Sequence, residues 1–167
     1  MNKAKLESQK DLEDIFTALN RQIYSYVYFR TGYSKEIAED LTQEVFLRVW
    51  EKRNDFNSKK GNIRTWVYRI AKNLVIDEYR KKKDIPNFNN FEGQSRGIEE
   101  EMIINDMQSF ILNKIKDLND AEQELISLYY IEGLELKEVS EIINKSYDAT
   151  KMAINRALHK LKNICNE

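Results

Sequence analysis

Helical periodicity extends along nearly the whole of the 167-residue chain, and only one proline and five glycines are available to interrupt it. Apolar residues recur at three- and four-residue spacing, which is the pattern of amphipathic helices with one buried face. Proline and glycine are the residues that most often break such helices. The sequence therefore predicts an all-α protein.

One segment departs from this periodicity. Residues 84–105 contain the only proline and two of the five glycines, and they are rich in asparagine and glutamate. A polar stretch of this length usually separates domains. The sequence thus predicts two small helical domains, residues 1–83 and 106–167, joined by a flexible linker.

Caps and turns divide the two domains into helices. Gly32 suits a left-handed helix end and Ser34 an N-cap, so the first two helices are expected to meet there. Asp120 is expected to cap a later helix, which Gly133 ends. In the first domain, the expected helices cover about residues 12–30, 35–53 and 61–83, the last with a bend near Asn73. In the second domain they cover about residues 107–118, 121–132, 136–144 and 147–163.

The helix predicted over residues 61–83 has two different faces. Its apolar stripe includes Trp66, which we expect in the core, whereas Tyr68 is expected on the solvent side. Cations neutralise phosphates, aromatic rings stack on bases and amides read base edges, so the outward face has the composition of a single-stranded nucleic-acid site. A solvated basic face that only confers solubility is the alternative. The candidate nucleic-acid contacts are Arg64, Tyr68, Arg69, Lys72, Asn73, Asp77, Arg80, Lys81 and Lys82.

Charge is unevenly distributed, although the chain as a whole carries a net charge of −1. Residues 48–83 have a net charge of +8, residues 84–148 of −10 and residues 149–167 of +3. Two basic blocks with an acidic block between them predict two separate contacts with polyanions. The nearly neutral total argues against a protein that coats nucleic acid indiscriminately.

Few residues are candidates for catalysis or metal binding. His159 is the only histidine and Cys165 the only cysteine, so neither a clustered metal site nor an internal disulfide is expected. No stretch approaches the roughly 18 consecutive apolar residues of a membrane helix, and the N-terminus lacks the apolar run of a signal peptide. We expect a cytoplasmic protein that is not an enzyme and needs no cofactor.

The C-terminal part has helix-turn-helix spacing. A short helix, a three-residue turn and a longer basic helix are predicted between residues 136 and 163. Ser146 is expected to cap the longer helix, with Tyr147 and Thr150 on its buried face. A plain structural hairpin of the same spacing is the alternative. The residues expected to contact DNA are Ser146, Asp148, Ala149, Lys151, Met152, Asn155, Arg156 and Lys160.

Together, three segments resemble a bacterial RNA polymerase sigma factor of the sigma-70 family, in its extracytoplasmic-function (ECF) group. AEDLTQEVFLRVWEK, residues 38–52, is similar to the family's polymerase-binding helix. GNIRTWVYRIAKNLVIDEYRKKK, residues 61–83, resembles its promoter-melting and −10 recognition segment, and residues 122–163 resemble its −35-reading helix-turn-helix. The resemblance implies that core RNA polymerase is contacted by Asp40, Gln43, Glu44, Phe46, Leu47, Trp50 and Lys52. The alternative for residues 38–52 is an acidic, solvated helix face.

By this resemblance the chain is a transcription initiation factor that binds −35 DNA and captures unpaired −10 bases, with the base pocket expected around Asn73. The recognition helix departs from the family pattern at Met152 and Ala153, and Asp148 would either repel phosphate or accept a hydrogen bond from a cytosine amino group. An anti-sigma partner is common in the family. Two other functions stay open, namely a stand-alone helix-turn-helix regulator and a helical adaptor that binds only proteins.

Overall fold

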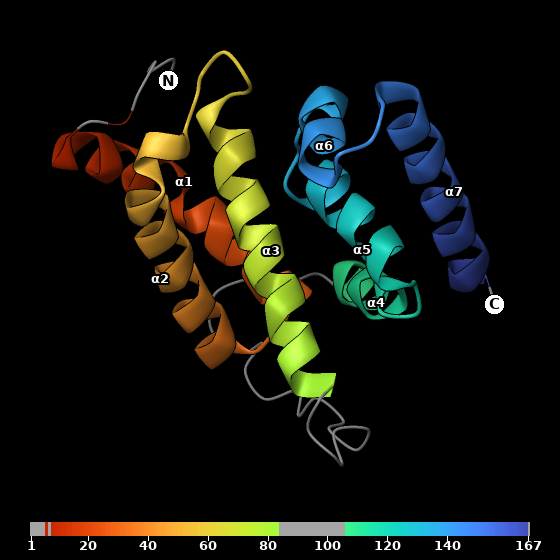
Figure 1. Cartoon of the computed structure of the whole chain (residues 1–167). Helices are drawn as coiled ribbons and strands as arrows, with labels where there is room; N and C mark the ends of the chain where they lie inside the picture. Colours follow the sequence, from red (N-terminus) through yellow and green to blue (C-terminus); the bar gives the residue numbers. More distant parts are fainter. Residues whose placement is uncertain (1–5, 7, 84–105, 167) are drawn as a thin grey trace. The chain divides into compact units, whose positions relative to one another are not determined.

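The computed structural model describes residues 6, 8–83 and 106–166, except for the side chains of residues 82, 83 and 106–109. Within these residues the only regular structure is helical, which confirms the all-α prediction (Figure 1). The chain forms two compact units, the first holding α1 to α3 and the second holding α4, α5, η3, α7 and most of α6. The predicted linker, residues 84–105, lies outside the described residues.

Helix α1 (Gln9–Arg30) begins with a capping box, because the Ser8 hydroxyl accepts a hydrogen bond from the Asp11 backbone while the Asp11 carboxylate accepts one from the Ser8 backbone. It ends where Gly32 takes a left-handed φ of 73°. Phe16 has the spacing of the buried apolar residues but is 46% exposed. The buried residues are Ile15, Leu19, Ile23, Tyr26, Val27 and Arg30.

Helix α2 (Lys35–Glu51) follows Ser34 as predicted, although the Ser34 side chain makes no capping hydrogen bond. A short 3₁₀ turn, η1 (Arg53–Asp55), continues it. The apolar residues Ile37 and Leu41 have the spacing of the buried face but stay partly exposed. The Thr42 hydroxyl can enter the core because it donates to the Ala38 carbonyl at 2.6 Å. The buried residues are Ala38, Thr42, Val45, Phe46 and Val49.

Helix α3 (Ile63–Lys83) packs against both α1 and α2 (Figure 1). The Asn62 side chain starts it by accepting a hydrogen bond from the Thr65 backbone at 2.7 Å. The helix is continuous through Asn73, so the bend expected there is wrong. The C-terminal part of α3 is hydrogen-bonded to α1, because the Tyr79 hydroxyl donates to the Arg30 carbonyl.

The second unit begins with α4 (Asp106–Ile115) and α5 (Asp120–Ile126), both of which pack against α7. The cap of α5 is Asn119 rather than the predicted Asp120, since Asn119 and Glu122 form a reciprocal capping box. A π-helical turn, η3 (Ser127–Ile131), extends α5 to Glu132. Gly133 then takes a φ of 64° and ends the run as predicted.

The predicted helix-turn-helix is present as α6 (Leu136–Ile143) and α7 (Tyr147–Asn166). Asn144 makes the turn with a φ of 56°, and the Ser146 hydroxyl caps α7 by accepting from the Ala149 backbone at 3.2 Å. Thr150 is buried as expected, because its hydroxyl donates to the Ser146 carbonyl at 2.8 Å. Tyr147 was expected in the core but is 52% exposed, since the first helical position lies beyond the packed part of the hairpin.

Candidate functional site

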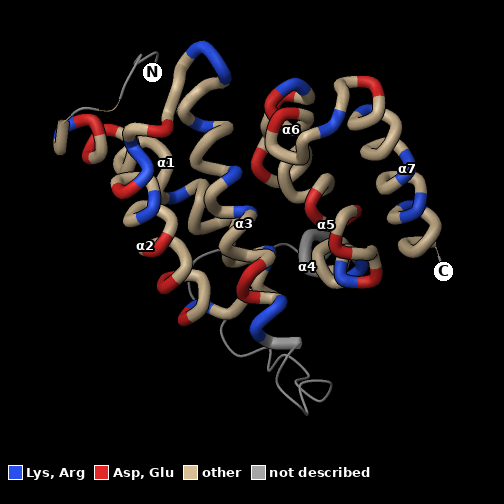
Figure 2. Tube along the Cα trace, viewed as in Figure 1, with Lys and Arg blue, Asp and Glu red and all other residues tan. Residues whose placement is uncertain are grey.

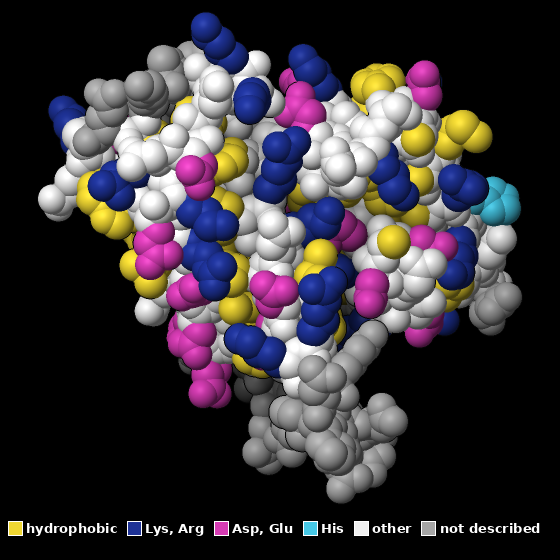
Figure 3. Space-filling view, viewed as in Figure 1, with side chains coloured by type: hydrophobic (Ala, Val, Ile, Leu, Met, Phe, Trp, Pro, Cys, Tyr) yellow, Lys and Arg dark blue, Asp and Glu magenta, His cyan; other side chains and the backbone are white. Residues whose placement is uncertain are grey.

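Two helices of the first unit carry opposite charge. Lys and Arg residues are distributed along α3, whereas α2 contains more Asp and Glu residues than Lys and Arg residues (Figure 2). The space-filling view shows the basic side chains of α3 as a column that follows the helix (Figure 3). A cationic helix beside an acidic one offers surfaces for two partners of different charge.

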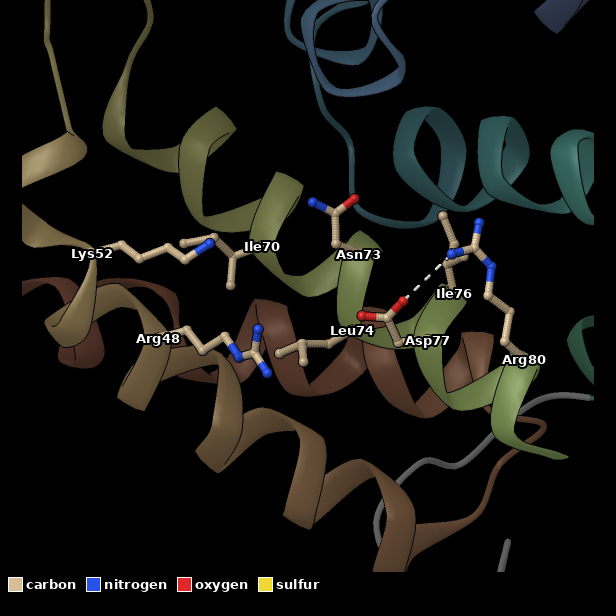
Figure 4. A pocket seen from close by; sticks show the side chains of 8 residues that line it. All are labelled: Arg48, Lys52, Ile70, Asn73, Leu74, Ile76, Asp77 and Arg80. Carbon is tan, nitrogen blue, oxygen red and sulfur yellow. Dashed lines mark ion pairs between the residues drawn. The ribbon is translucent and has the colours of Figure 1, made fainter.

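A pocket of about 380 Å³ lies between α2 and α3 (Figure 4). From α3 it is lined by three of the predicted nucleic-acid residues, Asn73, Asp77 and Arg80. Arg48 and Lys52 extend into it from the α2 side. The pocket therefore combines cations, an amide and a carboxylate, which are the groups that contact phosphates and base edges.

Ion pairs at this pocket restrict its charged side chains to different degrees. Arg80 and Asp77 lie 3.8 Å apart, and both side chains are mostly exposed. Arg48 is held more closely, since its Nε donates to the Glu44 carboxylate at 2.8 Å, and this hydrogen bond raises the pKa of the guanidinium. The sequence analysis missed Arg48. Arg48 lies four residues after Glu44 and four residues before Lys52. This spacing places all three side chains on one face of the helix predicted over residues 35–53 and could have identified Arg48.

Tyr68 is a correction to the predicted site. Its side chain is 0% exposed, and its ring packs edge-to-face on Tyr26 of α1 with centroids 5.5 Å apart. It therefore belongs to the core and has no surface on which a base could stack. The error arose because α3 packs against two helices, so its buried face is wider than the single stripe read from the sequence.

Trp66, in contrast, was expected in the core and is partly exposed. Its ring packs against the ring of the buried Phe56, at a centroid distance of 5.4 Å. Of the two aromatic residues weighed in the sequence analysis, Trp66 is thus the one with surface available to a ligand.

The segment from Asn57 to Asn62 leads directly into α3, and the sequence analysis assigned no contact to it before the helix begins. Lys59 and Lys60 are exposed in it, and the Asn57 side chain shapes it by accepting from the Lys59 backbone at 2.9 Å. Two adjacent lysines in a turn beside a basic helix were the signal that could have identified it.

The remaining predicted contacts on α3 whose side chains are described are at least partly exposed. Arg64, Arg69 and Lys72 are partly exposed, and Lys81 is exposed. The side chain of Lys82 lies outside the described residues.

The outward side of α2 holds most of the residues predicted to contact polymerase. Leu47 is 53% exposed, Asp40, Gln43 and Lys52 are exposed, and Glu44 is partly exposed. An exposed leucine between polar neighbours is a typical feature of a protein interface.

Two aromatic residues of that predicted interface are covered by neighbours. Phe46 is buried beneath Phe16 of α1, whose ring lies 4.8 Å away, so Phe46 cannot contribute contact area as predicted. Trp50 is partly exposed and carries the Arg53 guanidinium 4.1 Å above its ring. Because α1 covers this edge, Phe16 takes the exposed position that the sequence analysis gave to Phe46.

In the second unit, most residues predicted to contact −35 DNA lie on the solvent side of α7. Ser146 is exposed but already caps the helix, and Lys160 forms an ion pair with Glu122 of α5 at 2.8 Å. Burial alone would raise the pKa of Glu122, but the hydrogen bonds from Lys160 and Asn119 outweigh it and hold the pKa below its usual value. The other predicted residues are all exposed: Asp148, Ala149, Lys151, Met152, Asn155 and Arg156.

Large apolar side chains are also exposed on α4 and η3, where the sequence analysis predicted no site. They are Phe110, Ile111, Tyr130 and Ile131. A π-turn contains one residue more than an α-turn, so it changes the register of the side chains that follow. This register change is invisible to a pattern based on 3.6 residues per turn.

The described residues contain no group of three or more His, Cys, Asp and Glu side chains that could hold a metal ion. In the same part of the chain, the helices are too short or too polar to cross a membrane.

Comparison with protein families gives two matches. Residues 15–85 match Sigma-70 region 2, and residues 115–163 match Sigma-70 region 4. The two matched stretches correspond to the first unit and to most of the second.

Several curated relatives are similar over most of this chain. SigW, an ECF RNA polymerase sigma factor of Bacillus subtilis, is 30% identical over 97% of this chain and 92% of its own length. SigZ, an RNA polymerase sigma factor of the same organism, is 29% identical over 92% of this chain and 86% of its own length. BldN, an ECF sigma factor of Streptomyces coelicolor, is 28% identical over 85% of this chain, which spans only 55% of BldN.

Two solved structures share the fold. The sigma factor RpoE of Bartonella quintana, in complex with the anti-sigma factor NepR, superposes with a TM-score of 0.77 at 19% identity, covering 94% of this chain and 98% of RpoE. CnrH, in complex with the cytosolic domain of CnrY, gives a TM-score of 0.72 at 19% identity, covering 95% of this chain and 90% of its own.

Proposed function

The chain belongs to the sigma-70 family of bacterial RNA polymerase factors, in its ECF group, and we propose that its two units divide promoter recognition between them. As a sigma factor it directs core RNA polymerase to promoters and initiates transcription. In our proposal, residues 1–83 bind polymerase and the −10 element, residues 84–105 link the units, and residues 106–167 bind the −35 element. The chain makes and breaks no covalent bond in this role and works in the cytoplasm with polymerase.

The observation that carries this proposal is the pocket between α2 and α3. Asn73, Asp77 and Arg80 line it together with Arg48 and Lys52. The arginines and the lysine provide phosphate contacts, and the amide and carboxylate can hydrogen-bond base edges. We assign this pocket to the backbone and base edges of −10 DNA.

Capture of an unpaired base needs a stacking surface, and opening the duplex costs about a few kcal/mol. Stacking on an aromatic ring returns about 1–3 kcal/mol per base. Since Tyr68 is buried and α3 continues without a break through Asn73, we move this role to Trp66 and the adjacent segment 57–62. Lys59 and Lys60 would hold the phosphates on either side of the captured base.

The polymerase contact in this proposal is the outward side of α2, centred on Leu47. Asp40 and Gln43 surround this leucine, and Phe16 replaces Phe46 at its edge. Depletion of charge at the centre with polar residues around it is the usual arrangement of a protein interface.

The −35 contact is the exposed face of α7, which follows a three-residue turn as in other helix-turn-helix proteins. Two weak contacts on one tethered protein raise each other's effective concentration, so neither unit needs high affinity alone. A regulatory protein that binds the free factor, as the anti-sigma factor NepR binds RpoE, is a further partner in this proposal.

Run-off transcription with purified core polymerase on fragmented genomic DNA tests the proposal. We expect new transcripts that start at a common set of promoters only when this protein is added. A demonstrably folded, inhibitor-free protein that starts no transcript on any fragment would overturn it. Binding of the holoenzyme to a forked −10 DNA is a second test, and we expect the affinity to fall steeply with salt because phosphates are neutralised.

A further inference from the structure

The exposed face of α7 has an unusual composition for a helix that enters DNA. Asp148, Met152 and Asn155 are all exposed and follow one another at spacings of four and three residues, so they form a single line along the helix. Met152 is 63% exposed, which is the largest exposed fraction among the exposed large hydrophobic side chains of the described residues. The first two turns of α7 therefore present a carboxylate and an apolar side chain where a basic surface would be expected for phosphate contacts alone.

Asp148 cannot serve as a phosphate contact, because like charges repel. Its carboxylate lies in the first turn of α7, and within the described part of the chain no ion pair neutralises it. The capping position is already filled by Ser146, so Asp148 is not needed to satisfy the helix end. In the major groove, the group that an aspartate or glutamate recognises is the N4 amino group of cytosine, which donates a hydrogen bond.

Met152 lies one turn further along the same line. Its neighbour toward the helix start, Ala149, is exposed and small, so bases can approach the helix closely at this point. The apolar group that the major groove offers is the C5 methyl group of thymine. A flexible thioether side chain is well suited to cover such a methyl group.

We propose that α7 selects −35 elements in which a cytosine amino group lies next to a thymine methyl group, with Asp148 reading the cytosine and Met152 the thymine. This inference rests on the proposed function, since it requires that α7 enters the −35 major groove. Arg156 and Lys151 then contact the flanking phosphates, and they set affinity rather than sequence.

The test is a selection with the complete holoenzyme from a DNA library that carries eight randomised base pairs upstream of a fixed forked −10 element. The wild-type protein is compared with Asp148→Asn, Met152→Ala and the control Asp120→Asn. Asp120, like Asp148, is an exposed acid in the first turn of a helix, so the control removes the same interaction with the helix dipole. Thermal melting of each variant confirms that it is folded.

We expect the wild-type holoenzyme and Asp120→Asn to select the same element, with a cytosine beside a thymine. Asp148→Asn should lose at least about fivefold of the preference for cytosine at that position. Replacing the selected thymine with deoxyuridine removes one methyl group and should weaken wild-type binding about threefold to fourfold, but should leave Met152→Ala unchanged.

An unchanged cytosine preference in Asp148→Asn, a selected element without cytosine, or an equal loss with deoxyuridine in wild type and Met152→Ala would overturn this inference alone, because a selected element still shows a working −35 contact. A wild-type holoenzyme that selects no upstream element at all would overturn the assignment of α7 to −35 DNA as well.

Discussion

At the scale of single residues, one carboxylate connects two helices of the second unit. Glu122 caps α5 through Asn119 and also pairs with Lys160 of α7, which is the proposed recognition helix. Leu47 differs from Glu122, because its side chain is apolar and yet 53% exposed on the polar outward side of α2.

Glu122→Gln tests the ion pair without removing the cap, because the glutamine amide oxygen can still accept the Asn119 hydrogen bond. The pKa of Glu122 is lowered in the folded protein, so its stabilisation is present above the usual pKa of 4.5 and is lost as pH falls through the lower, folded-state pKa. We expect Glu122→Gln to reduce stability at pH 7 by about 0.5 kcal/mol, since Lys160 is half-exposed. Acid unfolding should be correspondingly less steep below pH 4.5.

Thermal and urea melts of the second unit between pH 3 and pH 7 measure this effect. Glu135→Gln, which changes an exposed glutamate near α6, serves as the control and should melt like wild type. A variant with unchanged stability at pH 7 would show that the Glu122–Lys160 pair contributes nothing in solution.

Leu47→Glu should weaken binding to core polymerase at least tenfold, because it places a charge at the centre of the proposed interface. The melting temperature should stay within about 2 °C of wild type, since the side chain is half-exposed. Pull-down with purified core polymerase is the measurement. Met152→Glu, which charges an exposed apolar residue of the other unit, should keep its polymerase binding.

At the scale of elements, α3 contributes to both the core and the proposed site, because it packs against α1 and α2 and also carries basic residues that are at least partly exposed, such as Arg69, Lys72 and Lys81. Tyr68 and Trp66 lie two residues apart on α3 but consequently have different surroundings. Tyr68 is enclosed against Tyr26, while Trp66 lies at the edge of the core against Phe56.

Trp66→Ala is expected to reduce open-complex formation by about 5- to 150-fold, which corresponds to the loss of one stacked base at about 1–3 kcal/mol. Binding to a fully paired −10 duplex should change much less. Tyr68→Phe is the matched control, since it keeps the buried ring and should open promoters like wild type. Equal losses for Trp66→Ala on paired and forked DNA would contradict the stacking role.

At the scale of the whole molecule, each of the two compact units carries one of the proposed DNA-contacting surfaces, and the first also carries the proposed polymerase contact. In this proposal, the affinity for a complete promoter depends on the effective concentration of one unit near its DNA element once the other unit is bound, which the segment between them sets.

Lengthening residues 84–105 to about twice their number with glycine and serine should therefore reduce promoter affinity only about threefold, because closure entropy grows slowly with length. Competition binding of holoenzyme to a promoter with both elements measures it. Binding to a forked −10 DNA that lacks a −35 element should not change. A much larger loss on the complete promoter would show that this segment does more than tether the units.

The sequence by itself determined the helices, the helix-turn-helix and the presence of two basic regions. These features depend on local spacing, on caps such as Ser146 and Gly133, and on charge, none of which requires knowledge of neighbours. Only the tertiary structure decided that Tyr68 is buried and Trp66 partly exposed, that Phe16 covers Phe46, and that Arg48 joins Asn73 and Asp77 around one pocket. Which flank of a helix is covered depends on how many helices pack against it and at which positions. That arrangement is set by contacts between residues far apart in the chain, so no local period can encode it.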